Sequence, residues 1–85
     1  FSDIDYNLEQ DILIDTIEVI IEEMIADSKE RYFQAVLFQM YAKDSNFSKI
    51  SREVGIPRTT ISRAVEDAKE YIKQQLKNRG IENEL

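Results

Sequence analysis

Apolar residues recur three and four positions apart along most of this chain, which is the spacing of one face of an α-helix. The pattern stops at three short stretches of polar or turn-forming residues. It predicts an all-α fold, a small bundle of four helices without the strands of a winged domain, over residues 8–26, 28–42, 47–54 and 58–78. We expect residues 1–7 to form an arm or loop ahead of the first helix.

The first predicted helix carries an apolar stripe and an acidic stripe. We expect its buried residues to be Leu13, Ile17, Ile20, Ile21 and Met24, with Ile14 and Ile25 widening the stripe. Acids recur four, three and four residues apart and form the second stripe: Asp11, Asp15, Glu18 and Glu22. Two interpretations stay open for it: a cation site or docking face for a basic partner, and an ordinary solvated surface.

The second predicted helix is rich in large side chains and is our candidate for the centre of the core. We expect Asp27 to cap it, with Glu30 three residues on in the manner of a capping box. Its apolar face is predicted to hold Phe33, Val36, Leu37, Met40 and Tyr41. Because Tyr32 and Phe38 lie off that face, the helix is predicted to be covered on two sides. Core packing explains this cluster better than a ligand pocket, since small domains need large side chains.

Residues 47–65 have the pattern of two short helices joined by a tight turn. Asn46 is suited to cap the first of them, and Gly55 follows where a positive φ is needed. Pro57 fixes φ at the entry to the second helix, where its missing N–H costs nothing. The inward residues are predicted to be Phe47, Ile50, Val54, Ile56, Ile61, Ala64, Val65, Ala68, Tyr71, Ile72 and Leu76. The segment therefore predicts a helix-turn-helix.

Donors occupy the outward positions at the front of the second helix of this motif. Its first turn carries no acid, and free helix N–H groups beside Arg58 favour an external anion such as a phosphate. Arg63 lies a turn further on, where it can address a guanine edge. Lys49 and Arg52 face outward on the preceding helix. We therefore predict binding of double-stranded DNA by Lys49, Arg52, Arg58, Thr59, Thr60, Ser62 and Arg63. The alternative is that Arg58 and Arg63 pair with acids of the domain itself, such as Glu53.

Three segments of the motif resemble the helix-turn-helix of bacterial sigma factor region four and of related phage regulators: Ile50–Ser51, Val54–Ile56 and Thr60–Arg63. The run Arg31–Tyr41 is similar to the helix that precedes this motif in sigma factors. The resemblance extends over residues 27–76. It implies a role in transcription initiation or regulation, with an upstream promoter element as the target and the RNA polymerase core as a partner.

Two residues depart from the sigma factor pattern without breaking its geometry. Ser51 stands where Ala is usual, and Pro57 stands where Ser or Thr usually caps the recognition helix. We expect residues 1–85 to form a single domain, divided into an acidic N-terminal helix over 1–26 and a helix-turn-helix core over 27–80. Ser51 is small, which allows the second helix of the motif to pass close to the first.

The net charge of −6 at first argues against DNA, but its distribution reverses that conclusion. Residues 1–27 hold nine acids and no base, whereas residues 28–85 hold eleven bases and eight acids. The excess positive charge therefore lies on the part of the chain that contains the motif. The acidic helix repels phosphate, so we expect it to lie away from the DNA.

The composition also narrows the chemistry. The chain has no Cys and no His, so it lacks the commonest general base and metal ligand, and we expect neither an enzyme nor a cofactor. No apolar run of about eighteen residues exists, which predicts no membrane span. The absence of Cys fits a cytoplasmic location. The chain begins with Phe1, which suggests an excised segment or a lost tag or leader.

Two further hypotheses about partners follow from the same residues. A lone helix-turn-helix often dimerises to reach useful affinity, and the apolar surplus of the first helix is available for a homodimer or for docking to a missing domain. Alternatively, the chain is a protein–protein interaction module, such as a phage packaging or regulatory subunit. In that case the acidic first helix binds a basic protein surface and the helix-turn-helix serves only as structure.

Overall fold

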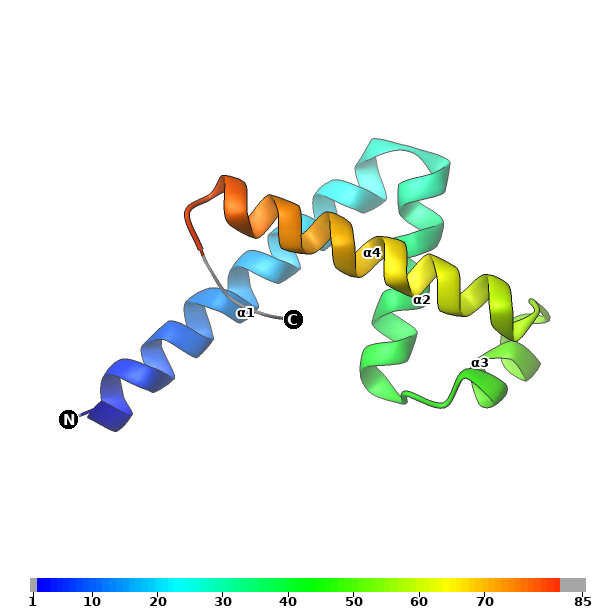
Figure 1. The fold of residues 1–85 in the computed structure, drawn as a ribbon, viewed down its shortest axis with the longest axis horizontal. Helices are drawn as coiled ribbons and strands as arrows, with labels where there is room; N and C mark the ends of the chain where they lie inside the picture. Colours follow the sequence, from blue (N-terminus) through cyan, green and yellow to red (C-terminus); the bar gives the residue numbers. More distant parts are fainter. Residues whose placement is uncertain (1, 82–85) are drawn as a thin grey trace.

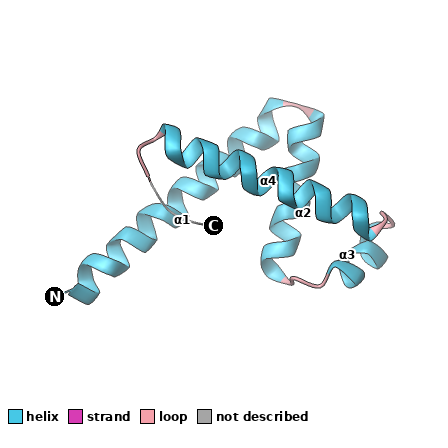
Figure 2. Ribbon diagram, in the orientation of Figure 1, coloured by secondary structure: helices cyan, strands magenta, loops and turns pink. Residues whose placement is uncertain are grey.

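A computed structural model describes the backbone of residues 2–81 and the side chains of residues 12–81. Within this range every element is a helix (Figures 1 and 2), so the predicted all-α bundle of four helices is confirmed. The elements are α1 (Ser2–Asp27), α2 (Lys29–Lys43), α3 (Phe47–Val54) and α4 (Arg58–Asn78). The bounds of α3 and α4 are those predicted from the sequence.

The helices α2 and α4 each contact the other three helices and together form the centre of the molecule, as predicted for the second helix. The helix α1 packs on α2 and on α4, and in the described part of the chain it does not contact α3. The molecule is elongated, with extents of 47 × 25 × 17 Å. Figure 1 shows the beginning of α1 at one end of the long axis and α3 at the other.

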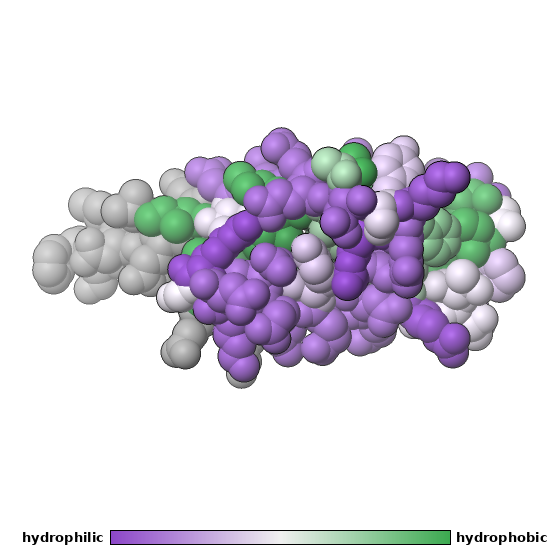
Figure 3. All heavy atoms as spheres, turned by 90° about the horizontal axis from the view of Figure 1, so that it is seen from above, coloured by the Kyte–Doolittle hydropathy of each residue, from purple (hydrophilic) through white to green (hydrophobic). Residues whose placement is uncertain are grey.

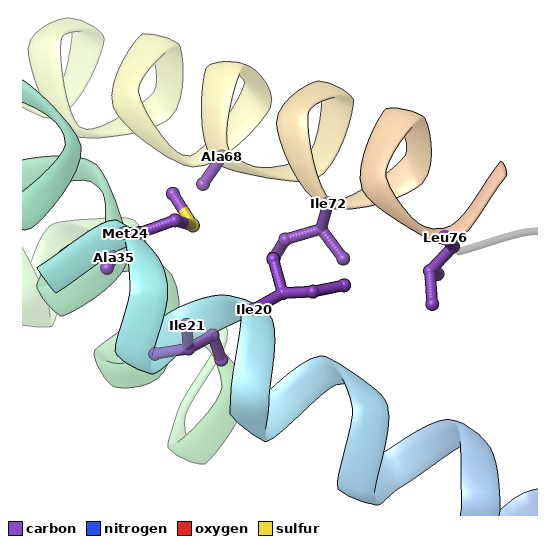
Figure 4. Close-up of a cluster of buried hydrophobic side chains, with 7 residues drawn as sticks. All are labelled: Ile20, Ile21, Met24, Ala35, Ala68, Ile72 and Leu76. Carbon is purple, nitrogen blue, oxygen red and sulfur yellow. The ribbon is translucent and has the colours of Figure 1, made fainter. Parts of the chain in front are cut away.

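Two apolar clusters hold the helices together, one at each half of α4. The first cluster joins α1, α2 and the second half of α4 (Figure 4), and its buried residues are Ile20, Ile21, Met24, Ala35, Ala68, Ile72 and Leu76. The second joins α2, α3 and the first half of α4, through Leu37, Ile50, Ile61, Ala64 and Val65. Phe38 packs against both clusters, as expected for a central helix covered on two sides.

The helix α1 differs from its prediction at its start and along its sides. It begins at Ser2, so the predicted arm over residues 1–7 is helical from residue 2 onward. Ile14 and Ile25 do not widen the buried stripe, because their side chains are 51% and 38% exposed. Ile20, Ile21 and Met24 are buried as predicted, and Leu13 and Ile17 pack against them.

The connection between α1 and α2 is capped one residue later than predicted. Asp27 is the last residue of α1, and Ser28 caps α2 by accepting a hydrogen bond from the Arg31 N–H at 3.1 Å. A single residue, Ser28, therefore separates the two helices, which pack against each other.

The buried face of α2 agrees only in part with the predicted one: Leu37 is buried and Met40 and Tyr41 pack against the second cluster, as predicted. Gln34, Ala35 and Leu37 are buried, whereas Phe33 is 36% and Tyr32 52% exposed. Ala35 is small enough for α1 and α4 to approach closely. The side-chain oxygen of Gln34 (Oε1) accepts a hydrogen bond from the Arg31 guanidinium at 2.8 Å. That guanidinium also lies 4.1 Å from the ring centre of Tyr71, so it ties α2 to α4.

Candidate nucleic-acid interface

The start of α3 and the turn between α3 and α4 are defined by three local interactions. Asn46 begins α3 by accepting the Lys49 N–H at 3.1 Å, as predicted. Gly55 ends it in the left-handed conformation, with φ of 71°, and its N–H donates to the Ser51 carbonyl at 2.9 Å. The Ser51 hydroxyl donates to the Ile56 carbonyl at 2.6 Å. This last bond was not foreseen from the sequence, and it ties α3 to the residue that precedes Pro57 in the turn.

Val54 is the one predicted inward residue of α3 that is exposed, at 36% of its surface. Ile50 is buried and Phe47 is half-buried, so the first half of α3 packs against the rest of the domain. Val54 does not pack against the second apolar cluster, whereas Ile56, two residues further along, does.

The first turn of α4 combines unshielded helix N–H groups with basic and hydroxyl side chains. Pro57 precedes the helix with φ of −55°, and its carbonyl accepts the N–H groups of Thr60 and Ile61. Over its described length α4 has neither a side-chain cap nor an acid in the first turn. The partial positive charge of the helix terminus is therefore not neutralised by the protein.

The two predicted arginines lie at the surface on this part of α4. Arg58, Thr59, Thr60 and Arg63 are exposed, and Ser62 is half-buried. Among residues 12–81 neither arginine forms an ion pair with an acid, so the predicted alternative pairing with Glu53 is not present. Arg58 instead donates to the Ser48 hydroxyl at 3.1 Å, which holds its guanidinium against α3.

A shallow hollow of about 230 Å³ lies between the start of α3 and the start of α4. Phe47, Arg58, Thr59 and Ser62 line it. The Phe47 ring stacks on Tyr41 with a centroid distance of 4.9 Å and an angle of 19°. The Tyr41 ring is in turn 5.0 Å from the Lys69 ammonium. The hollow thus has an aromatic wall, formed by Phe47 and supported by Tyr41, and a cationic rim at Arg58.

Lys49 and Arg52 are exposed on α3, but only one of them is engaged by the domain. The Lys49 ammonium pairs with the Asp44 carboxylate at 3.1 Å. This hydrogen bond is the main cause that lowers the pKa of Asp44 below its usual 3.8. It also raises the pKa of Lys49 above its usual 10.5. Asp44 therefore offsets the positive charge of Lys49, which weakens the attraction of this side chain for a phosphate.

The acidic stripe lies away from this interface. Asp15, Glu18 and Glu22 are exposed on α1, and the side chain of Asp11 lies outside the described residues. The neighbouring Glu23 pairs with Arg79 at 2.7 Å, beyond the far end of α4. No group of three or more acids is arranged to hold a metal ion among the described side chains, so the cation-site interpretation has no support there.

Within residues 12–81, Lys69 faces the Tyr41 ring, and no ion pair joins Glu66 to Lys69 or Glu70 to Lys73 on α4. In the described range no helix has the length and apolar character needed to cross a bilayer.

The chain matches no family model, and no curated protein or solved structure is significantly similar to it.

Proposed function

We propose that this chain binds double-stranded DNA through the first two turns of α4. The observation that carries the proposal is the exposure of Arg58 and Arg63 on a helix start that has no cap and no acid. Within the described range α1 makes no contact with α3, and its Glu23 pairs with Arg79 beyond the far end of α4, so the acids described on α1 do not crowd the tip of α4.

Each donor at the helix tip has a distinct role in this proposal. Arg58 is held by Ser48 at the rim of the hollow, and together with the helix N–H groups it binds a phosphate. Thr59 and Arg63 lie four residues apart on the exposed face of α4 and meet the base edges. Arg52 adds a backbone contact from α3. Glu66 and Asp67 follow directly, which limits entry into the groove to the front of the helix.

Within this function, the sigma factor resemblance of residues 50–63 supports a more specific proposal. The DNA target is an upstream promoter element, and the partner is the RNA polymerase core. The arrangement of a short α3, a glycine turn and a long α4 is compatible with that assignment, and many other helix-turn-helix regulators share it.

The experiment is a titration of fluorescent duplex DNA with the chain, read by anisotropy at several salt concentrations. A pool of random duplexes first selects a preferred sequence. The affinity should then fall steeply with salt, with a log–log slope of about −0.9 for each phosphate contacted. Arg63→Ala should reduce discrimination against a mismatched duplex by about 1–3 kcal/mol.

The matched control is Lys77→Ala, which removes one charge from the exposed far end of the same helix. It should leave both affinity and sequence preference close to those of the unmodified chain. If Arg63→Ala and Lys77→Ala have equal effects on every duplex, binding is a property of overall charge and the proposed readout is wrong.

A further inference from the structure

The helix α1 has a second face, distinct from the one that packs in the core. Ile12 and Val19 lie seven residues apart, and their side chains are 51% and 47% exposed. Asp15 lies between these two residues and Glu22 follows Val19. The two acids are also seven residues apart, and both are exposed. Steps of three, four and three residues put all of these side chains on one stripe. We call Ile12, Asp15, Val19 and Glu22 the outer stripe.

The fold does not need the outer stripe. The core-facing residues of α1 are Leu13, Ile17, Ile20 and Met24, which lie on the opposite side of the helix. Figure 1 shows the first half of α1 extending beyond the other helices, and Figure 3 shows apolar surface beside its grey N-terminal part. Apolar residues on more than one side of a helix indicate that the helix is covered on more than one side.

The spacing of the outer stripe is that of a helix-pairing seam, in which apolar residues occupy alternate three- and four-residue steps. Here every second seam position is a carboxylate. A second copy of this chain fits such a seam poorly, because in a parallel pair acid meets acid and in an antiparallel pair acid meets isoleucine or valine. Residues 1–27 carry nine acids and no base, so two copies of α1 also repel one another.

We propose that the outer stripe of α1 docks a helix of another protein in which apolar and basic residues alternate at the same spacing. The apolar residues of the partner cover Ile12 and Val19, and its lysines or arginines meet Asp15 and Glu22. The docking surface is separate from the front of α4, so it holds whether or not α4 binds DNA. DNA bound at α4 and a helix bound at α1 would not compete for the same residues.

The probe is a synthetic helical peptide with leucine and lysine at alternate positions of such a seam, labelled with a fluorophore. A second peptide has glutamate in place of every lysine. Anisotropy titration with the full chain should give binding of the lysine peptide and none of the glutamate peptide. Val19→Gln should weaken the lysine peptide about tenfold, the fold-change that corresponds to the buried value of one aliphatic side chain.

Two matched variants separate the outer stripe from general surface effects. Val54→Gln makes the same kind of change at a valine that is 36% exposed on α3, and it should leave peptide binding unchanged. Glu22→Lys should weaken the lysine peptide at least tenfold, whereas Glu66→Lys on α4 makes the same charge change and should have less than a twofold effect. Both acids are exposed, so the fold should persist, which far-UV circular dichroism checks.

Three results would overturn the proposal. The first is equal binding of the lysine and glutamate peptides, which would remove the role of the carboxylates. The second is a concentration-dependent dimer in sedimentation that Val19→Gln abolishes, which would assign the stripe to a second copy. The third is equal loss of lysine-peptide binding in Glu22→Lys and Glu66→Lys, which would reduce the effect to net charge.

Discussion

Replacement of Gly55 by alanine tests whether the turn between α3 and α4 has the geometry described. Gly55 has φ of 71°, a left-handed conformation that costs an L-residue about 1–2 kcal/mol. A Cβ added there meets no atom within 4 Å, so no clash adds to this cost. Alanine also lowers the entropy of the unfolded chain, which offsets about 0.4–1 kcal/mol. The expected net loss is about 1 kcal/mol, or about 4–8 °C in Tm for a domain of this size.

The assay is urea and thermal unfolding followed by far-UV circular dichroism, with two comparison variants. Gly55→Asn should lose less than Gly55→Ala, because asparagine tolerates the left-handed region better. Gly80 has a similar φ of 79°, and a Cβ added there also meets no atom within 4 Å, so Gly80→Ala should have a loss similar to that of Gly55→Ala. A Gly55→Ala chain as stable as the unmodified one would show that this residue is not held at positive φ, and the described turn would be wrong.

The remaining predictions concern two polar contacts. Arg31→Ala should destabilise the fold by about 1–3 kcal/mol in urea unfolding, because the buried Gln34 carbonyl loses its donor and Tyr71 loses its cation. Asp44→Asn should free Lys49 and make the salt dependence of DNA affinity steeper, by up to about 0.9 in log–log slope. Carbon-13 NMR should place the pKa of Asp44 below 3.8, so its pair with Lys49 contributes stability at neutral pH that is lost as the pH falls through that pKa.

The helix-turn-helix was predictable from the sequence because its boundaries depend on local chemistry. Asn46, Gly55 and Pro57 each act on the backbone within a few residues, so α3 begins and ends, and α4 begins, where these residues require. The bond from Ser51 to the Ile56 carbonyl was missed, although a serine four residues before the turn glycine is a signal that a future prediction can use.

The faces of α1 and α2 were harder to predict because they depend on contacts between helices. Apolar character alone placed Phe33 and Ile14 inward, but both are exposed. Where α1, α2 and α4 meet, the structure uses Ala35, which permits close approach, and the buried Gln34 on the same helix accepts a hydrogen bond from Arg31 at its side-chain oxygen. Neither choice is visible until the neighbouring helices are in place. The ion pair between Lys49 and Asp44 was not predicted either, because it depends on how the two side chains are positioned in the fold.

The most direct test of DNA binding by the tip of α4 is a two-dimensional amide NMR titration of the chain with duplex DNA. The account predicts that the largest shift changes occur at the start of α4, from Arg58 to Arg63, with smaller ones at Arg52 and Ser48 in α3. The amide signals of α1 should keep their chemical shifts. The largest changes along α1, or none at the start of α4 while DNA binds, would contradict it.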